Sequence, residues 1–351
     1  MTEFMKGIVK DKPEAGATWR EDLPIPEIKD NELLIRVKAA AICGTDMHIY
    51  PWTAWAQARL KLPMVFGHEF AGEVVAIGST VRGFEVGDRV AGETHIPCNK
   101  CYQCQTGNQH NCNDMKIIGV HTEGCFAEYI AIPVDCAWRL DDSLSFEIGA
   151  MLEPMGVAVH GVLAGDIGGK SIAVYGCGPI GLMGVGVAAA CGASKIFAID
   201  VFDQKLEVAK QMGADITLNS RNDNVIEQIL QATEGQGVDI TVDFTGNGNA
   251  IKEGFAILRK GGRFTLVGLP NEPVALNLTD DIIYKEATVQ GVTGRLMYKT
   301  WWQCNELLKS GKIDLSPVIG RKYALKDYDQ AFSALKAGAT GKMLLIPDKC
   351  N

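Results

Sequence analysis

The sequence predicts an α/β protein with two domains, a strand-rich, partly open barrel and a doubly wound parallel sheet. The chain has 351 residues, which is more than one hydrophobic core usually organises. Its first part alternates apolar and polar residues in short runs separated by turns, a pattern typical of antiparallel strands. From residue 156 onward, short apolar runs alternate with helical patterns, which favours a parallel sheet covered on both faces.

Composition and charge exclude several classes of function. The formal net charge of −8 opposes a nucleic-acid partner, because phosphate binding requires a basic surface. No uninterrupted apolar run reaches the length of a membrane span, and the N-terminus MTEFMKGIVKDKPE lacks the apolar core of a signal peptide. Eleven cysteines, an odd number without a signal peptide, oppose a disulfide framework. The sequence therefore predicts a cytoplasmic protein that contacts neither membranes nor nucleic acid.

The barrel begins with the alternating runs MKGIVK and ELLIRVKAAAI, separated by turns at Pro24, Pro26 and Asp30. The stretch FAGEVVAIGSTVRGFEVGDRVAG continues the alternation, and its segments GSTVRG and EVGD supply further turns. These runs predict a small twisted barrel of mostly antiparallel strands.

The stretch from Ile42 to Glu69 gathers side chains that bind metals and pass protons. Cys43 and His68 form a borderline-soft pair of ligands that suits zinc. A catalytic zinc takes three protein ligands and keeps one position open, so a third ligand is needed. Glu69 and Glu153 are both candidates, and the sequence does not decide between them. Because adjacent side chains on a strand point to opposite faces, His68 and Glu69 can share a metal only if the strand is irregular there.

Four cysteines follow the pattern C-x2-C-x2-C-x7-C, namely Cys98, Cys101, Cys104 and Cys112. Thiolates at these spacings can surround one ion tetrahedrally, and a zinc site without an open position is structural. An iron–sulfur cluster is the competing interpretation, but the proline that would follow the fourth cysteine is missing. The pattern therefore favours zinc. Six other cysteines are predicted to be buried without a chemical role: Cys125, Cys136, Cys177, Cys191, Cys304 and Cys350.

The second domain opens with the strand SIAVY, which leads directly into the glycine-rich motif GCGPIG and a helix. In this context Gly176 permits the tight turn, Gly178 lets a pyrophosphate approach the backbone, and Gly181 lets helix and strand pack closely. Pro179 and Ile180 complete the loop, whose free N–H groups at the helix start would receive phosphates. The motif predicts a dinucleotide-binding sheet. Its other strands are expected at KIFAID, ITLN, VDITVDFTG, GRFTLVG and ATVQGV.

The strand KIFAID ends in Asp200, where a carboxylate would accept hydrogen bonds from the hydroxyls of the adenosine ribose. A carboxylate there repels the 2′-phosphate of NADP, so NAD is the predicted cofactor. Lys205 follows a few residues later and is a candidate contact to the same ribose, although a solvated helix lysine is an equal alternative.

After Arg295 a helix, a strand, a second helix and a last strand return the chain to the barrel. The predicted catalytic, zinc-binding domain is therefore discontinuous, with residues 1–155 and 296–351. The nucleotide-binding domain is inserted as residues 156–295.

In their order along the chain, GHEFAGEVVAIG, GDRVAG, the four-cysteine loop and GCGPIG resemble the zinc-dependent medium-chain alcohol and polyol dehydrogenases. The resemblance covers essentially the whole chain and implies a GroES-like barrel joined to a Rossmann domain. Within this family, CGTDMHIYPWTAW, GETHIPC and GRLMYKTW are most similar to the threonine dehydrogenases. The implied activity is oxidation of the secondary alcohol of L-threonine to 2-amino-3-oxobutanoate in threonine catabolism.

The resemblance also implies roles for single residues. Cys43 and His68 would ligate a catalytic zinc, with Glu69 or Glu153 as the third ligand or Glu153 in proton transfer. Thr45 and His48 match the positions that relay the proton of the alcohol. With the structural site, two Zn²⁺ ions per chain are expected.

Further contacts are expected around the substrate and the nicotinamide. His95 either lines the substrate pocket or is an ordinary loop residue, and Arg295 pairs with a substrate carboxylate, a cofactor phosphate or a surface acid. Backbone at the ends of two strands is expected near the nicotinamide half of NAD: Val267, Gly268, Leu269, Val292 and Thr293.

Family resemblance further implies a homo-oligomer, a tetramer or a dimer with the tetramer favoured. Two rival functions stay open. One is the same chemistry on a polyol or diol such as sorbitol, xylitol or 2,3-butanediol. The other is a non-catalytic nucleotide-binding sensor. The joint presence of the ligand and relay set opposes it: Cys43, His68, Glu69, Thr45 and His48.

Overall fold

The computed structural model describes residues 3–347 and divides into two compact units. The first combines Met1–Glu153 with Ile319–Asn351, and the second is Pro154–Val318. The chain thus leaves the nucleotide unit at Val318 and not at Arg295, where the sequence places the boundary. The reason is that Ile313 lies against Gly186 of helix α6 (Pro179–Ala190), which keeps the intervening segment on the second unit.

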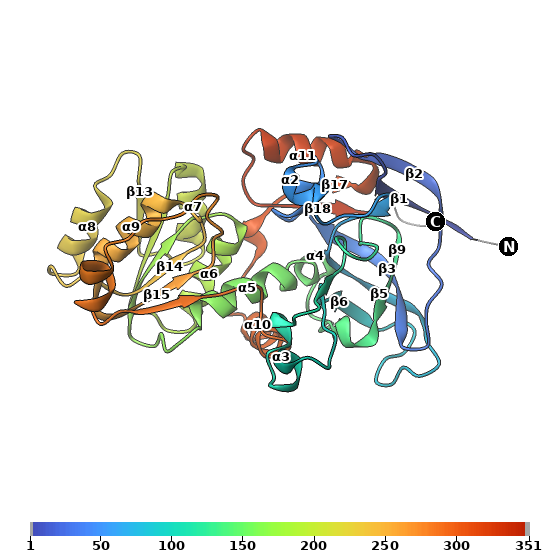
Figure 1. The fold of residues 1–351 in the computed structure, drawn as a ribbon, viewed down its shortest axis with the longest axis horizontal. Helices are drawn as coiled ribbons and strands as arrows, with labels where there is room; N and C mark the ends of the chain where they lie inside the picture. The colour runs from blue at the N-terminus through green and yellow to red at the C-terminus, as the bar shows by residue number, and fades with distance from the viewer. Residues whose placement is uncertain (1–2, 348–351) are drawn as a thin grey trace. The chain divides into compact units, whose positions relative to one another are not determined.

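The first unit is built on strands that run from the N-terminal part of the chain and from its C-terminal part (Figure 1). Its strands are β1 (Phe4–Lys10), β2 (Thr18–Pro24), β3 (Glu32–Ala41), β4 (Met64–Val65), β5 (Glu69–Ile77), β6 (Arg89–Gly92), β7 (His95–Ile96), β8 (Lys116–Ile117), β9 (Tyr129–Pro133), β10 (Ala137–Arg139), β17 (Ile319–Ala324) and β18 (Lys342–Ile346). Its helices are α1 (Asp46–Ile49), α2 (Ala54–Gln57), α3 (Tyr102–Gln105), α4 (Phe146–Gly149) and α11 (Tyr328–Lys336), with the 3₁₀ turns η1 (Gln109–Asn111), η2 (Val134–Cys136) and η5 (Leu325–Asp327).

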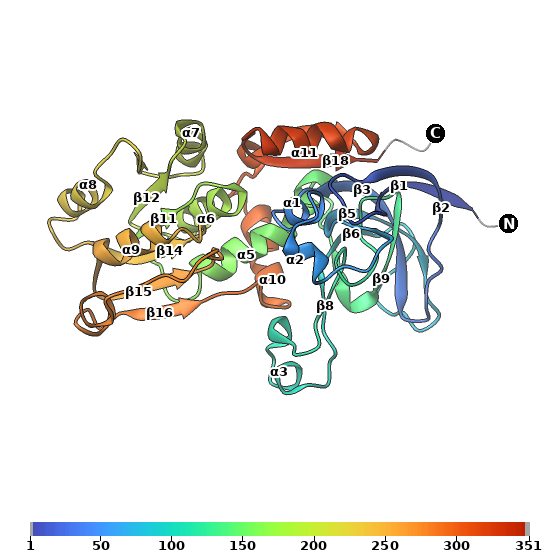
Figure 2. The same ribbon diagram turned by 45° about the horizontal axis from the view of Figure 1, so that its top comes forward.

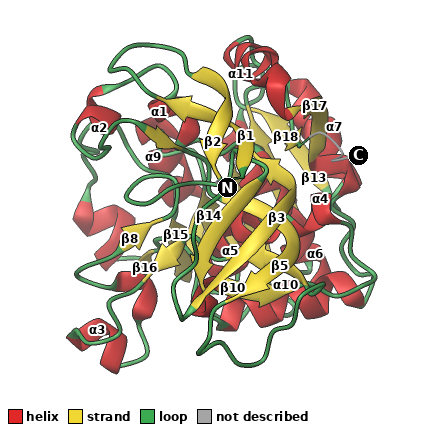
Figure 3. Cartoon of the chain, turned by 90° about the vertical axis from the view of Figure 1, so that its right-hand side faces the viewer, coloured by secondary structure: helices red, strands yellow, loops and turns green. Residues whose placement is uncertain are grey.

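The main sheet of this unit has the order β10-β6-β5-β3-β18-β17, and β9 also pairs with β3. Figure 3 shows the long strands β3 and β5 side by side, and they are antiparallel. A second sheet has the order β2-β1-β4, and β7 pairs with β8. Apolar residues of the two larger sheets share one core, which includes the fully buried side chains of Ile8, Ile35 and Phe70. The predicted strand-rich barrel is confirmed.

The second unit contains one parallel sheet of six strands in the order β13-β12-β11-β14-β15-β16. Its strands are β11 (Ser171–Tyr175), β12 (Lys195–Asp200), β13 (Ile216–Asn219), β14 (Val238–Asp243), β15 (Leu258–Leu266) and β16 (Thr288–Gly291). Its helices are α5 (Leu152–Val162, which begins at the end of the first unit), α6, α7 (Asp203–Gln211), α8 (Val225–Ala232), α9 (Gly248–Ile257) and α10 (Lys299–Lys309), with the π-helical turn η3 (Leu278–Ile283) and the 3₁₀ turn η4 (Ser316–Val318).

The strand order places the functional end of this sheet. All five residues of β11 are buried, as expected for a central strand covered on both faces. The chain proceeds outward from β11 to β13 and then crosses back to β14, so β11 and β14 flank the switch point. Right-handed connections put α6 and α7 on one face and α8 and α9 on the other. Ligands of such sheets bind at the carboxyl ends of the strands beside the switch point.

No helix within residues 3–347 combines the length and the apolar character needed to cross a membrane.

Candidate functional site

Three of the predicted metal-binding side chains come together at the end of the barrel sheet. Cys43 follows β3, and Glu69 is the first residue of the neighbouring strand β5. His68 lies just before that strand, after Gly67, which has a left-handed φ of +89°. The irregular backbone that His68 and Glu69 require is therefore present. One ligand atom each of Cys43, His68 and Glu69 lies within 4.8 Å of the others.

The chemistry of this group fits a zinc ion. A thiol, an imidazole and a carboxylate are the ligands that zinc takes in proteins, and three of them leave a fourth position for a substrate. Nδ1 of His68 faces Oδ1 of Asp46 at 4.0 Å, and neither buried atom has a hydrogen-bond partner within residues 3–347. The other oxygen of Asp46 accepts a hydrogen bond of 2.8 Å from the backbone N–H of Cys43. Asp46 is thus placed to orient both Cys43 and His68, as a carboxylate behind a metal-bound histidine does.

Glu69 and Glu153, the two candidates for the third zinc ligand, have different surroundings. Among the described residues, the compact ligand group includes Glu69 and does not include Glu153. Glu153 is buried at the start of α5, and its charge acts on Glu69 and Lys342. Lys342 Nζ lies 2.7 Å from Oε1 and 2.6 Å from Oε2 of Glu69.

The position of Lys342 beside the ligand group was not predicted, because in the sequence it is an ordinary lysine of a C-terminal strand. Burial lowers the pKa of Lys342, but the charges of Glu69 and Cys43 act in the opposite direction, and the net shift of the pKa is upward. Lys342 therefore stays positively charged inside the barrel, next to the ligand group.

The predicted proton-transfer residues lie on the short segment after Cys43. The hydroxyl of Thr45 is 3.8 Å from the sulfur of Cys43, at the start of α1. His48 is exposed on α1, and its ring centroid is 5.8 Å from that of Trp55.

His95 is held by a buried acid that the sequence analysis missed. Glu93 is fully buried, and its Oε1 accepts the backbone N–H of His95 at 2.8 Å. The same oxygen lies 3.1 Å from Nδ1 of His95, so the imidazole has a defined orientation. The sequence signal is an acid two residues before a histidine at the start of β7.

The four-cysteine loop forms a second compact group on a lobe that carries α3 and extends away from the barrel strands (Figure 2). The sulfur of Cys101 is 3.5 Å from that of Cys104 and 3.8 Å from that of Cys112. Backbone N–H groups of Asn113 and Cys104 lower the pKa of Cys101 to about 6. The backbone N–H of Cys98 donates to the sulfur of Cys112 at 3.2 Å. Four sulfurs served by backbone donors fit a tetrahedral zinc.

The glycine-rich motif has the geometry that the sequence predicts. Gly176 has a φ of +91° directly after β11, and Gly178 caps the start of α6, with Pro179 in its first turn. A Cβ on Gly181 would lie 1.7 Å from the carbonyl oxygen of Gly176, so only glycine permits this close packing. The first N–H groups of a helix have no partner within the helix, so the start of α6 is suited to receive an anion.

Asp200 lies beside this turn at the end of β12. Its Oδ2 accepts a hydrogen bond of 2.7 Å from the N–H of Cys177, which ties the carboxylate to the glycine turn. Its Oδ1 accepts from the N–H of Val201 at 2.8 Å and lies 3.7 Å from Nζ of Lys205.

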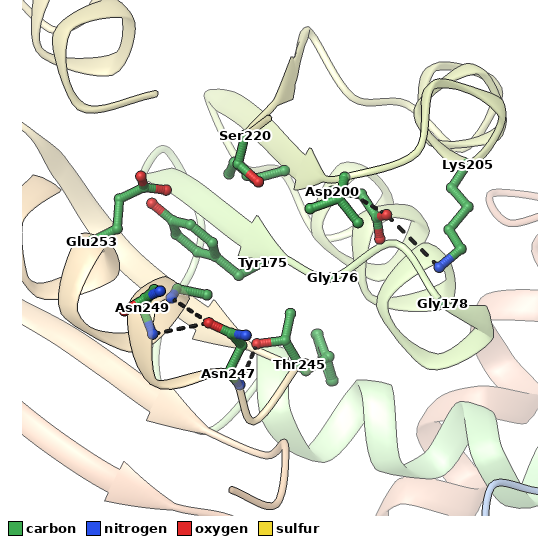
Figure 4. Close-up of a pocket in the computed structure, with 14 residues that line it drawn as sticks. Tyr175, Gly176, Gly178, Asp200, Lys205, Ser220, Thr245, Asn247, Asn249 and Glu253 are labelled. Carbon is green, nitrogen blue, oxygen red and sulfur yellow. Dashed lines mark hydrogen bonds and ion pairs between the residues drawn. The ribbon is translucent and has the colours of Figure 1, made fainter. Parts of the chain in front are cut away.

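A cavity of about 630 Å³ lies at these carboxyl ends (Figure 4). Of the predicted cofactor contacts, it is lined by Gly176, Gly178, Asp200 and Lys205. The sequence analysis missed the wall that β14 and α9 provide, because that wall depends on the strand order. The missed residues include Tyr175, Ser220, Phe244, Thr245, Asn247, Asn249 and Glu253.

The residues expected near the nicotinamide follow β15 and β16. The N–H groups of Val267 and Gly268 both donate to the carbonyl of Asp243, each at 2.9 Å. Val292 is buried, and its N–H donates to Leu266, which holds the ends of β15 and β16 together. The exposed residues here are Leu269 and Thr293.

Arg295 is 1% exposed and lies against α5, where a Cβ on Gly156 would come within 2.9 Å of its Cδ. The nearby imidazole of His160 contacts the carbonyl of Gly294 at 3.1 Å. Arg295 is therefore a buried residue of the nucleotide unit and not a member of a surface ion pair.

Comparison with known proteins matches both units. The family model for the alcohol dehydrogenase GroES-like domain matches residues 29–142, and that for zinc-binding dehydrogenase matches residues 179–310. The L-threonine 3-dehydrogenase of Bacillus velezensis is 46% identical over 344 residues, 98% of this chain and 99% of that protein.

Solved structures agree with this result. A zinc-binding dehydrogenase from Sinorhizobium meliloti, bound to NADP, has a TM-score of 0.91 at 30% identity, with 98% of this chain and 100% of that chain covered. The 2R,3R-butanediol dehydrogenase of Bacillus subtilis has a TM-score of 0.89 at 28% identity, with 98% and 100% covered.

These similarities are not confined to a nucleotide-binding fold, which many unrelated proteins share. One family model matches each unit, and the Bacillus velezensis relative aligns with nearly the whole chain. The resemblance seen in the sequence is therefore confirmed, and a non-catalytic nucleotide sensor is not supported. The chain belongs to the family of zinc-binding alcohol dehydrogenases.

Proposed function

We propose that the protein oxidises the secondary alcohol of L-threonine to 2-amino-3-oxobutanoate, with NAD as the hydride acceptor. The observation that carries the reaction type is the compact group of Cys43, His68 and Glu69 with the Thr45 hydroxyl beside it. The substrate is favoured by relatives in bacteria and archaea, 42–46% identical over at least 98% of this chain, that are L-threonine 3-dehydrogenases.

We assign two zinc ions to each chain. Cys43, His68 and Glu69 would hold the catalytic ion, and Cys98, Cys101, Cys104 and Cys112 would hold the structural one. When bound, the catalytic ion would supply Lewis acidity at the substrate oxygen, and the nicotinamide ring would accept the hydride.

The chain's own residues handle the proton. The Thr45 hydroxyl lies next to the ligand group, so it can accept the proton of the substrate alcohol. His48 is exposed three residues later, and its imidazole is placed to pass the proton on to solvent. Glu153 is a buried acid whose charge acts on Glu69 of the ligand group, and we assign it a further role in proton transfer.

The remaining site residues are assigned by position. His95, which is oriented by Glu93, would contact the substrate head group. Arg295 is 1% exposed and packs against α5, so it is not assigned a contact to the substrate or to a cofactor phosphate. Residues at the ends of β15 and β16 would line the nicotinamide half of the cofactor: Val267, Gly268, Leu269, Val292 and Thr293.

We expect Asp200 to set the preference for NAD over NADP. Replacing it by Asn removes the charge that repels a 2′-phosphate and leaves the cation of Lys205 beside it. In Asp200→Asn the KM for NADP relative to NAD should fall about tenfold, which corresponds to about 1.4 kcal/mol.

The control for this prediction is Asp203→Asn, which removes a nearby negative charge on α7 outside the cavity lining. It should keep the wild-type ratio of the two KM values. An unchanged ratio in Asp200→Asn would contradict the role of Asp200.

We also propose a homo-oligomer, with the tetramer favoured. Strand β16 is the edge of the nucleotide sheet, and Val289 on it is 39% exposed (Figure 2). The preceding segment exposes Leu278, Ile283 and Tyr284 at 59–68%. An unpaired edge beside exposed apolar side chains is suited to pairing with a second copy. Light scattering should give the mass of four chains, and the mass of one chain would contradict the proposal.

The free state of the cysteines supports our proposal of a cytoplasmic location. Ten cysteines in the described part of the chain are free thiols, as expected in a reducing compartment. Cys350 lies outside the described residues.

The function is tested by following NADH formation at 340 nm with L-threonine, sorbitol and 2,3-butanediol in parallel. Turnover of threonine with NAD, lost after removal of the metal by a chelator, is the expected result. Turnover of only the polyol or the diol would contradict threonine as the substrate and favour a polyol or diol dehydrogenase. The structural similarity to the butanediol dehydrogenase supports that second candidate function.

A further inference from the structure

Lys10, the last residue of β1, is a fully buried cation that belongs to neither metal-binding group and does not line the nucleotide cavity. Its ammonium group donates to three main-chain carbonyl oxygens: that of Glu14, that of Gly16 at 2.6 Å and that of Tyr50 at 3.0 Å. Buried lysines in proteins are usually paired with acids. Among the residues that the structure describes, every hydrogen-bond acceptor of the Lys10 ammonium group is instead a carbonyl. Lys10 therefore connects the loop after β1 to the end of α1.

The turn at residues 50–53, which follows α1, has a strained backbone. Trp52 has a φ of +60°, in the left-handed region that a large side chain rarely adopts. Such a conformation persists only where the surrounding structure holds it. Nζ of Lys10 lies 5.3 Å from the centroid of the Trp52 ring and also binds the carbonyl of Tyr50. Lys10 thus contacts the residues on both sides of Pro51 and holds the turn in this conformation.

The same turn folds back onto His48. The carbonyl oxygen of His48 accepts hydrogen bonds from the N–H of Thr53 at 3.1 Å and from its hydroxyl at 3.3 Å. Helix α1 consists of four residues, and a helix this short is not stable by itself. The turn also leads into α2, which carries the Trp55 ring beside the His48 imidazole (Figure 2). The position of His48 therefore depends on the turn.

We propose that Lys10 is a positioning residue for proton transfer, because it holds the turn at residues 50–53 and the turn holds His48. This inference rests on the proposed function in so far as His48 passes the proton of the alcohol on to solvent. It gives a role to the segment YPWT, which follows the predicted relay residues and had no function assigned to it.

The test compares the effect of Lys10→Met on kcat in the presence and in the absence of His48. Methionine keeps an unbranched apolar side chain and removes the ammonium group. The rates are measured on the zinc-loaded proteins with saturating NAD and a saturating concentration of the alcohol that the wild type oxidises.

His48→Gln alone should lower kcat about a hundredfold, as expected for loss of a proton-transfer group. Lys10→Met should lower kcat about tenfold, because a small displacement of such a group has a large effect on the rate. In the His48→Gln background, Lys10→Met should lower kcat by less than about twofold, since the imidazole that it displaces is gone. The KM for the alcohol and the zinc content should keep their wild-type values, because none of the assigned zinc ligands lies on α1 or on the turn.

Thr53→Val tests the second step, from the turn to His48. It removes the hydroxyl donor and keeps the shape of a partly exposed side chain, so the variant should fold even if Lys10→Met does not. It should lower kcat about threefold, and again only when His48 is present.

The matched control is Lys285→Met in the nucleotide unit. Nζ of Lys285 also donates to three main-chain carbonyls, at the end of α9. The control should lower the melting temperature as Lys10→Met does, but it should keep the wild-type kcat.

The outcomes separate this inference from the proposed function. An unchanged kcat in Lys10→Met or Thr53→Val, or an equal loss with and without His48, would overturn the positioning role and leave the proposed function standing. A wild-type kcat in His48→Gln would remove His48 from the mechanism, and the role of Lys10 with it. Absence of turnover with every alcohol would overturn the proposed function and this inference together.

Discussion

Replacing Cys43 by serine is expected to lower the turnover number about a thousandfold or more and to reduce the zinc content from two ions per chain to one. The hydroxyl of serine is a poor replacement for a thiolate, because zinc in proteins is bound by Cys, His and carboxylate ligands. A Lewis-acid metal supplies several kcal/mol of stabilisation to the transition state, and each 1.4 kcal/mol changes the rate about tenfold. Metal analysis of the dialysed variant and its rate with saturating NAD test both expectations.

The matched control is Cys191→Ser, because Cys191 is half-buried and belongs to neither metal-binding group. This control should retain both zinc ions and the wild-type rate. If Cys43→Ser retained both ions, Cys43 would not be a zinc ligand. If it lost one ion and kept its rate, the ion held by Cys43, His68 and Glu69 would not take part in the reaction.

The parts of the site that the sequence predicts are those in which the partners are close along the chain. Cys98 and Cys112 are separated by a short loop, so their spacing alone indicates a shared ion. Gly176 and Asp200 belong to consecutive strands of one motif, whose order makes their proximity predictable. In each case local chain geometry limits the distance between the groups, and the tertiary fold adds little.

Residues whose contacts depend on tertiary pairing were not predictable in this way. Lys342 is 273 residues from Glu69 along the chain and reaches it only because β18 pairs with β3, which pairs with β5. Glu253 faces Tyr175 because α9 covers the sheet beside the switch point, which the sequence pattern does not specify. The end of the nucleotide unit at Val318, in place of the predicted Arg295, has a similar cause, because Ile313 packs against α6.

Replacing Lys342 by methionine is expected to destabilise the protein by about 3–5 kcal/mol, because it leaves the carboxyl group of Glu69 buried and without its partner. Glu69 is fully buried, and Lys342 is 4% exposed. For a unit of this size each kcal/mol lowers the melting temperature by about 2–4 °C, so a decrease of roughly 10 °C is expected. The matched control is Lys322→Met, which breaks an ion pair with Glu147 of equal length, 2.7 Å, with Lys322 53% exposed. It should change the stability by no more than about 1 kcal/mol.

The metal ion distinguishes a lost ion pair from lost packing at Lys342. A zinc ion beside Glu69 would partly compensate for the missing ammonium group, so the difference in melting temperature between wild type and Lys342→Met should grow when both proteins are stripped of metal. The double variant Lys342→Met, Glu69→Gln should then recover most of the metal-free difference, because the buried charge itself has been removed. If the double variant were as unstable as Lys342→Met, packing of the lysine stem would account for the effect. The pair would then be a consequence of the β3–β18 pairing and not one of its causes.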